Sequence, residues 1–238
     1  ELYDLYFRQT NHFRVSQEHL DYIRSLGTLK VLFFDGNAPY QYIKDGKLTG
    51  FAVEYLERFA EATGLQYEAV VADSYAEGLK MVSQGKIDLV ACIATNSTLS
   101  AFKDMRFTVP FFNSFSVTAC ANPDPHEHPT DVEFQINTQL ALNEIQKTKK
   151  GVQLDYYSLS YYLRKQNVYD NLMVDWANTK NYSYVICISG NISGGLVTIL
   201  NQYISSVNDQ TIQTMLYSYS GDKVEYTLWE WLLANRLT

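Results

Sequence analysis

The side chains with the clearest chemical use stand where a predicted strand ends. The apolar run Lys30–Phe34 is short enough to be a fully buried strand, and Pro39 breaks the pattern soon after it. Asp35 and Asn37 lie in this break, with Tyr40 directly behind it. Open α/β sheets bind their ligands beyond the carboxyl ends of their strands. We therefore expect these three side chains to line a binding cleft.

A second polar group follows a second apolar run, Ile87–Ala94. Thr95 and Asn96 stand just past this predicted strand, and their hydroxyl and amide groups could bind a ligand. The alternative interpretation is a solvated loop with a helix cap. The residue types alone leave both interpretations open.

The elements that would position these groups alternate between strand and helix. Apolar residues at helical spacing predict a helix over Phe51–Thr63, and Gly64 is a typical stop signal. A strand at Leu65–Val71 and a helix at Tyr75–Ser83 follow. Strands that alternate with helices indicate parallel βαβ units, so we predict an α/β fold.

Several segments resemble lobe one of the type 2 periplasmic solute-binding proteins, the Venus-flytrap modules of bacterial transporters and extracytoplasmic sensors. They are the Pro-aromatic turn at Pro39, the segment GKLTGFAVEYL at Gly46–Leu56, GKIDLVA at Gly85–Ala91, and FTVPF at Phe107–Phe111. The resemblance runs from about Leu29 to Ala121, and its motifs correspond to bacterial extracellular solute-binding proteins of family 3.

This resemblance implies a two-lobed α/β fold with two crossing hinge strands, near Phe112–Ala121 and Tyr182–Ser189. We expect a helical lead-in at residues 1–27, lobe one at 28–118 and 187–238, and lobe two at 119–186. Lobe two is short for the family: it is either pared down or lacks a segment. A single continuous sheet would argue against this division.

The resemblance also extends the candidate site. The cleft would be lined by Asp35, Asn37, Tyr40, Thr95, Asn96 and Ser114 from lobe one, and by Asp155 and Tyr156 from lobe two. Asp155 falls where amino-acid binders of the family place an aspartate that pairs with the ligand ammonium. The alternative for Asp155 is a turn or a helix cap.

One departure from the family pattern concerns the ligand. Amino-acid binders carry an arginine after the GKIDLVA-like strand, and its guanidinium grips the ligand carboxylate. Ala101 stands at that position here. The remaining acidic and aromatic groups favour a small polar or cationic ligand, such as an amine or a small heterocycle, over a free α-amino acid. They also fit a module without a ligand.

Other functional classes are not favoured. The sequence has no GxSxG, HExxH, P-loop or GxGxxG motif, and its His and Cys residues lack zinc spacing, so we expect no enzyme, cofactor or metal. The net charge of -7 argues against a nucleic-acid partner. Buried free thiols are the favoured state of Cys92, Cys120 and Cys187, although a Cys92–Cys120 disulfide is a possible pairing.

The expected function is that of an extracytoplasmic sensor module in a bacterial histidine kinase or cyclic-dinucleotide cyclase. The helix predicted over Gln17–Leu26 resembles the lead-in of such modules. We expect the parent protein to be tethered to a membrane, with a homodimer as one possible state. The alternative is the substrate-binding protein of an ABC-type uptake transporter, and a minor alternative is a ligand-free interaction module.

Overall fold

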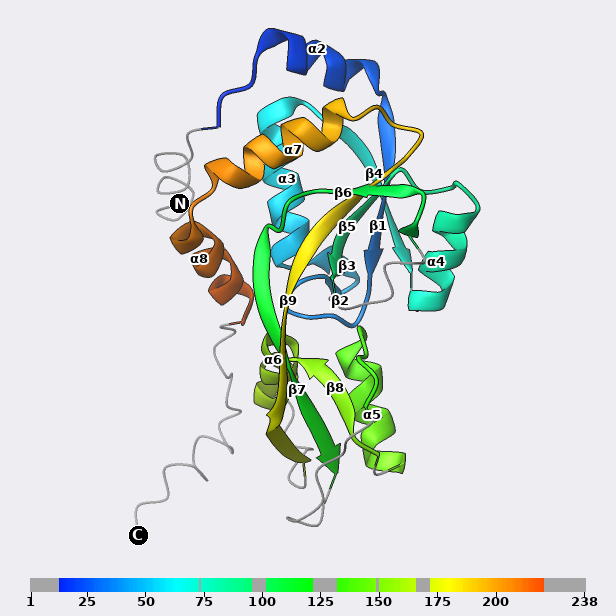
Figure 1. Cartoon of the computed structure of the whole chain (residues 1–238), viewed down its shortest axis with the longest axis vertical. Coiled ribbons are helices and arrows are strands. Elements are labelled where there is room, and N and C mark those ends of the chain that lie inside the picture. The colour runs from blue at the N-terminus through cyan, green and yellow to red at the C-terminus, as the bar shows by residue number, and fades with distance from the viewer. Residues whose placement is uncertain are drawn as a thin grey trace.

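The computed structural model describes residues 13–72, 74–95, 102–121, 132–148, 150–165 and 172–220, and it has two lobes joined by two long strands (Figure 1). The larger lobe holds both chain-terminal parts of this range, and the smaller lobe holds the middle part. The predicted two-lobed α/β fold is thus confirmed. The lobe boundaries at residues 118 and 187 stay a prediction.

Lobe one is built on a parallel core. Strand β1 (Thr28–Phe34) lies between β4 (Gln66–Ala72) and β5 (Leu89–Ala94), and both neighbours are parallel to it. Helix α3 (Phe51–Thr63) buries Phe51, Tyr55 and Phe59. The buried strands are short apolar runs and the helix has one apolar face, as their sequence patterns predict.

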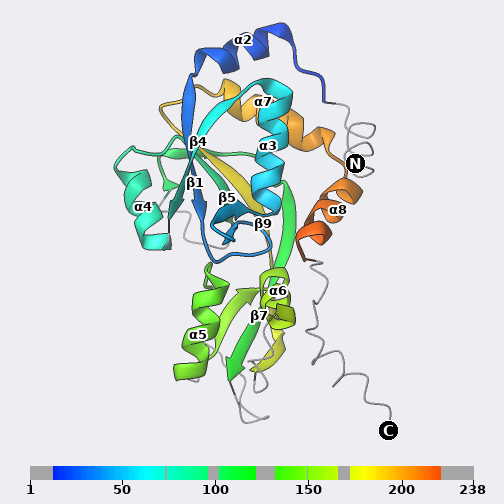
Figure 2. The same ribbon diagram turned by 180° about the vertical axis from the view of Figure 1, so that it is seen from behind.

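The remaining elements of lobe one surround this core. They are the β2–β3 hairpin (Tyr42–Lys44 and Lys47–Thr49), α4 (Tyr75–Ser83), β6 (Met105–Phe107), α7 (Gly195–Ser206) and α8 (Asp209–Ser220). The lead-in helix α2 (Gln17–Ser25) begins directly after its N-cap residue, Ser16, and lies along α7 (Figure 2). The Tyr22 hydroxyl and Ser193 Oγ are 2.6 Å apart and hold this contact.

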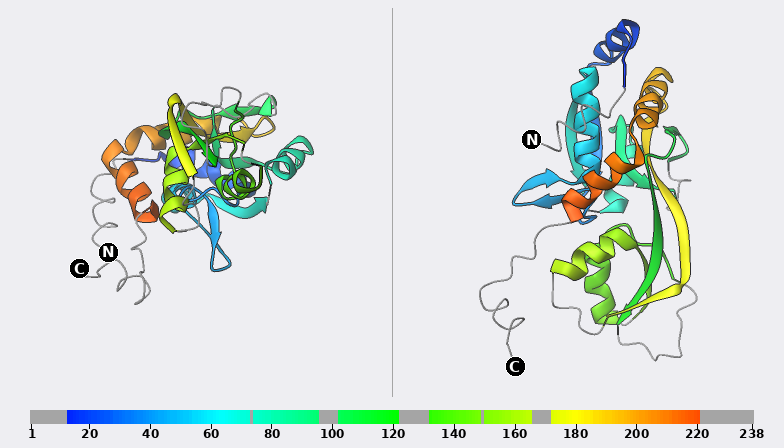
Figure 3. Two further views of the ribbon diagram at one scale, coloured as in Figure 1. Left: turned by 90° about the horizontal axis from the view of Figure 1, so that it is seen from below. Right: turned by 90° about the vertical axis from the view of Figure 1, so that its left-hand side faces the viewer.

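The crossing strands are β7 (Phe112–Ala121) and β9 (Leu172–Ser189), which run side by side from one lobe to the other (Figure 3). They are antiparallel and paired from Phe112–Tyr184 to Ala121–Leu172. β7 has the predicted bounds, whereas β9 begins at Leu172 and not at Tyr182.

The hydrogen-bonded ladder is continuous, in the order β4-β1-β5-β9-β7-β8 with β6 also on β9. A continuous sheet therefore does not argue against two lobes, contrary to our expectation. The reason is that the two crossing strands pair with each other and belong to both lobes. The lobes are distinguished instead by their separate helical layers (Figure 3).

Lobe two is small but has its own apolar core. It consists of β8 (Val152–Asp155), α5 (Thr138–Thr148), α6 (Tyr156–Lys165) and the adjoining halves of the crossing strands. Leu142, Ile145, Leu154 and Leu159 are buried together there. The short lobe is thus a packed unit.

The structure also describes the state of the three cysteines and the character of the helices. Cys92, Cys120 and Cys187 are free and buried, so the favoured state is confirmed and a Cys92–Cys120 bridge is not formed. Among the described helices, none has the length and apolarity needed to traverse a bilayer. The amphipathic pattern of residues 226–235 predicts a further helix, and this segment lies outside the described residues.

Candidate interlobe site at Asp155

The carboxylate of Asp155 is the chemical centre of the contact between the lobes. It lies at the end of β8 and is 1% exposed. One oxygen, Oδ1, accepts hydrogen bonds from the Tyr40 hydroxyl at 3.1 Å and from the Ser158 backbone N–H at 2.8 Å. The other, Oδ2, accepts from Ser114 Oγ at 2.5 Å and from the Tyr182 hydroxyl. Four donors thus surround one buried carboxylate.

These donors come from every part of the molecule that meets at the junction. Ser114 on β7 and Tyr182 on β9 are directly paired in the crossing ladder, so their side chains project from the same face. Ser158 lies in the first turn of α6, and Asp155 caps that turn. Tyr40 is the donor that belongs to lobe one and lies outside the crossing strands. The helix-cap interpretation of Asp155 is therefore confirmed, and its pairing with a ligand ammonium stays a prediction.

Burial decides the electrostatics of this group. Desolvation raises the pKa of the Asp155 carboxyl above its ordinary value, and its hydrogen bonds with Ser114, Tyr182 and Ser158 oppose that rise. The pKa values of Tyr40 and Tyr182 lie well above the usual range. Burial is the main cause, and the nearby Asp155 carboxylate is the second, so both hydroxyls are neutral donors. Within the described part of the chain, Asp155 has neutral partners alone.

A loop of lobe one is also inserted into lobe two. Asn37 Oδ1 accepts a hydrogen bond from Ser158 Oγ at 3.0 Å, and the Tyr162 hydroxyl accepts one from the Ala38 N–H at 3.5 Å. Ala38 and Tyr42 belong to the apolar core of lobe two, although they are part of lobe one in the chain. The two lobes therefore share a packed contact and not only a hinge.

Aromatic rings enclose the inner side of this contact. The Tyr40 ring lies 4.5 Å from Tyr184 and 5.8 Å from Phe112, measured between centroids. Phe134 meets Tyr182 edge-on at 5.3 Å. These rings exclude water from the carboxylate, which strengthens its hydrogen bonds and raises the cost of leaving it unpaired.

The structure brings four of the eight predicted site residues together: Asn37, Tyr40, Ser114 and Asp155. Two others organise the backbone. The Asp35 carboxylate accepts hydrogen bonds from the Gly36 and Ile43 N–H groups, both at 2.7 Å. Thr95 Oγ1 accepts one from the Ser183 N–H at 3.0 Å and so ties the end of β5 to β9. Their side-chain hydrogen bonds thus brace a loop and a strand end.

Tyr156 makes different contacts from those we expect. Its ring stacks on Phe115 at 4.7 Å and meets Trp176 at 5.5 Å, as part of an aromatic cluster apart from the Asp155 contacts. The reason is that α6 begins at Tyr156, and the helical turn directs Ser158, not Tyr156, towards Asn37 of lobe one. Asn96 and Ala101 lie outside the described residues.

Sequence reasoning missed Ser158 and Tyr182. A signal for Ser158 was present, because Asp155 followed three residues later by Ser158 is the spacing of a capping turn. Tyr182 becomes a site residue only through its register opposite Ser114, which the sequence does not reveal.

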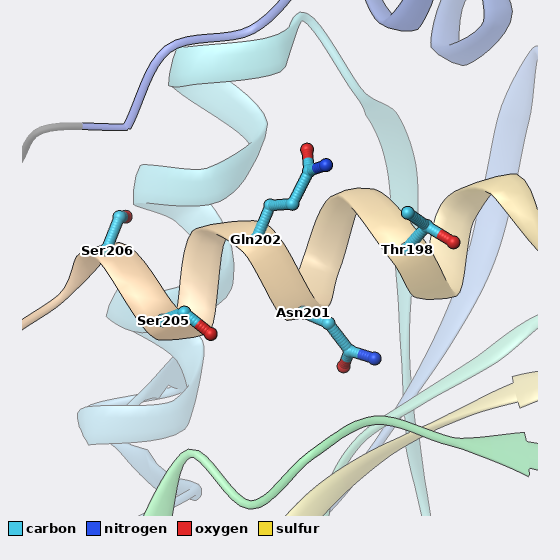
Figure 4. A pocket seen from close by; sticks show the side chains of 5 residues that line it. All are labelled: Thr198, Asn201, Gln202, Ser205 and Ser206. Carbon is cyan, nitrogen blue, oxygen red and sulfur yellow. The ribbon is translucent and has the colours of Figure 1, made fainter.

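Two shallow recesses can be described, and the first shares Ser114 and Tyr182 with the Asp155 contacts. One runs along the crossing strands and is lined by Asn113, Ser114, Phe115, Asn181, Tyr182 and Ser183. The other is on the outer surface of α7, where Asn201 and Gln202 point to opposite sides of the helix (Figure 4). Asn201 already accepts a hydrogen bond from the Val109 N–H at 2.8 Å. The α7 surface therefore does not gather its polar groups towards one ligand.

The sequence profile of the bacterial extracellular solute-binding proteins, family 3, matches residues 29–167, which is more than half of the chain. The chain belongs to this family. The match spans the loop of Asn37 and Tyr40, the crossing strand β7 and the Asp155 turn, so the candidate site lies within the family region apart from Tyr182 and Tyr184 on β9.

Similar proteins place this solute-binding module in different settings. A probable histidine-binding protein of Campylobacter jejuni is 27% identical over 168 residues, which cover 65% of this chain and 62% of the relative. A membrane-bound lytic murein transglycosylase F of Vibrio vulnificus is 36% identical over 87 residues, or 37% of this chain and 16% of the relative. The chain thus spans less than two thirds of these curated relatives.

Among solved structures, the BvgS periplasmic domain of B. pertussis superimposes with a TM-score of 0.74 at 17% identity. The alignment covers 89% of this chain and 46% of that one. Identity at this level shows the shared fold alone.

The raised pKa of Asp155 gives a pH prediction. Between its ordinary pKa of 3.8 and its higher folded value, the folded state binds more protons than the unfolded chain. The stability that Asp155 contributes should therefore rise as the pH falls through this window. Asp155→Asn removes the titration, so wild type should gain stability relative to this variant on acidification.

Urea unfolding of both proteins at about pH 7 and about pH 4.5 measures this, with a slope of at most about 1.4 kcal/mol per pH unit for one group. A stability difference between the two proteins that does not change with pH would contradict the raised pKa.

Proposed function

We propose that this solute-binding module is the extracytoplasmic sensor of a bacterial signalling protein and binds a small cationic or neutral polar solute between its lobes. The observation that carries the proposal is the buried Asp155 carboxylate at the junction, whose partners are hydroxyls and one backbone N–H. Such a group favours a ligand that donates hydrogen bonds or carries positive charge.

The chemistry of the surrounding residues supports this ligand class. A cation would compensate the desolvated carboxylate and could contact the faces of Tyr40, Tyr182 and Tyr184. Ala101 stands where amino-acid binders carry the arginine for the ligand carboxylate. The similarity to a protein named for histidine binding is the main argument against this preference, because histidine is itself a free α-amino acid.

The docked lead-in supports a sensor over a transporter subunit. Helix α2 lies along α7 and is fixed by the Tyr22–Ser193 contact, so a segment that precedes the module is mechanically coupled to lobe one. In a sensor such coupling transmits lobe movement to the rest of the protein. A transmembrane helix followed by a kinase or cyclase domain in the full-length chain would agree with this proposal, whereas a lipid-anchored chain encoded beside permeases would contradict it.

The ligand prediction is tested by a thermal-shift screen of amines, small heterocycles, amino acids, sugars and nucleosides, followed by calorimetry. An amine or heterocycle at a hundred times its Kd should stabilise the module by about 2.7 kcal/mol. Asp155→Asn should weaken binding of a cation more than tenfold, the effect of removing a charge-assisted hydrogen bond of about 1.5–3 kcal/mol.

Asp21→Asn is the matched control, because it removes a carboxylate that is 61% exposed and lies on α2, and it should leave affinity unchanged. Tight binding of glutamine or another plain α-amino acid, with no response to amines, would show that the ligand preference is wrong. Equal affinity of wild type and Asp155→Asn would remove Asp155 from the site.

A further inference from the structure

We propose that Tyr40 is an internal ligand of Asp155 and holds the two lobes closed before any solute binds. This inference rests on the proposed function in one respect, the position of the solute at Asp155. It adds the direction of the response: a solute must displace Tyr40 from the carboxylate and so loosen the contact between the lobes.

Of the hydrogen bonds to Asp155, the one from Tyr40 depends on closure of the lobes. Ser114 and Tyr182 stand on the crossing strands and Ser158 stands on α6, so they remain near Asp155 whatever lobe one does. The Tyr40 hydroxyl, 3.1 Å from Oδ1, is the donor to this carboxylate that lobe one supplies from outside the crossing strands. It is therefore the contact that separation of the lobes breaks.

Hydrogen bonds from this chain already use the acceptor positions of the Asp155 carboxylate. An ionised carboxylate has about four lone-pair positions, and four donors of this chain already occupy Asp155. A solute ammonium or N–H group can therefore bind Oδ1 or Oδ2 only if one donor leaves. Tyr40 is the donor whose departure does not disturb the fold of lobe two.

The Tyr40 side chain cannot move away from the carboxylate independently of lobe one. Its side chain is fully buried, its ring packs on Tyr184 and Phe112, and its carbonyl accepts the Ala52 N–H at the start of α3 at 2.8 Å. The hydroxyl thus moves with lobe one. Displacing it means moving the lobe.

Other hydrogen bonds between the lobes also favour the closed arrangement. The Asn37–Ser158 and Ala38–Tyr162 hydrogen bonds join the same loop to α6. Asn137 Nδ2, just before α5, donates to the Asp35 carbonyl at 3.1 Å. Lobe one therefore offers lobe two a preformed set of partners, and closure needs no solute to bridge them.

The experiment measures lobe separation in the solute-free chain. Spin labels are attached at Glu61→Cys on α3 and Lys147→Cys on α5, both exposed, while the three native thiols are buried. Wild type should give one short distance. Tyr40→Phe, which removes only the hydroxyl, should add a second and longer population.

Tyr55→Phe is the matched control. Tyr55 is also a buried tyrosine of lobe one, and its hydroxyl has no hydrogen-bond partner among the described residues, so its distance distribution should equal that of wild type. Ser158→Ala provides a second route to the same result, because it removes the Asn37 contact from the lobe-two side and should also lengthen the distance.

A long or broad distance in wild type, or a Tyr40→Phe distribution equal to that of wild type, would overturn the inference. These measurements require no ligand. The inference can therefore fail while the proposed function stands, and the proposed function can fail while the inference stands. When the screen above provides a ligand, Tyr40→Phe should bind it roughly two- to tenfold more tightly, the effect of one competing hydrogen bond. Weaker binding by this variant would also contradict the inference.

Discussion

Replacing Asp155 with alanine is expected to lower the free energy of unfolding by about 3–4 kcal/mol, because each buried donor left without a partner costs about 1–3 kcal/mol and these costs are not additive. The carboxylate is the common acceptor for Tyr40, Ser114, Tyr182 and the Ser158 N–H. The rings around it limit access of the water that could replace those bonds. Relief of the buried charge offsets part of the loss.

Urea unfolding measures this loss, and two variants frame it. Asp155→Asn keeps the shape and one acceptor oxygen, so it should lose less than the alanine variant. Asp21→Ala removes an exposed carboxylate and should change stability by no more than about 0.5 kcal/mol. If Asp155→Ala were as stable as wild type, the carboxylate would not stabilise the junction.

Gly50→Ala is expected to cost about 3 kcal/mol or more, because backbone strain and a steric clash act together there. Gly50 precedes α3 with φ 127°, and a Cβ atom at this position would lie 2.4 Å from the Tyr40 carbonyl oxygen and 2.9 Å from the Gln41 nitrogen. Relieving the clash would shift the backbone that carries the Tyr40 side chain.

The control is Gly64→Ala at the other end of the same helix. Gly64 also has a positive φ, 77°, but a Cβ atom added there would have no neighbouring atom within 4 Å among the described residues. It should lose only the strain contribution, about 1–2 kcal/mol. Thermal or urea unfolding measures both losses. Gly50→Ala should lose more, because its backbone lies in a region essentially restricted to glycine and its Cβ also clashes, and equal losses would show that the Tyr40 backbone can move at little cost.

Local elements of the fold were predictable from short-range patterns. Helix α4 and strand β7 have the predicted bounds, and α3 ends at the predicted Gly64. Capping residues, glycine stops and apolar periodicity act over a few residues, so they can be read from the sequence. Strand β9 shows the limit, because only Leu172–Val174 form an apolar run among its first ten residues, 172–181, and pairing with β7 on both sides of a bulge extends the strand.

The proximity of four predicted site residues could be anticipated from the sequence, but their direct contacts could not. Asn37, Tyr40, Ser114 and Asp155 could be placed near the cleft because they stand at strand ends or on the crossing strand. That Tyr40 meets Asp155 directly depends on the angle between the lobes, which is a property of the whole packed contact. The orientation of Tyr156 depends on where α6 begins, and a shift of one residue there redirects a side chain by about 100°.

The burial of the three thiols affects how the folded protein resists oxidation outside the cytoplasm, where this family acts. Oxidation and disulfide exchange proceed through the thiolate. Burial raises the pKa of Cys92, Cys120 and Cys187, so little thiolate forms in the folded protein, and no two of these side chains are bonded to each other. The module is therefore protected from an oxidising compartment by its packing, without a reductant and without needing an oxidant to mature.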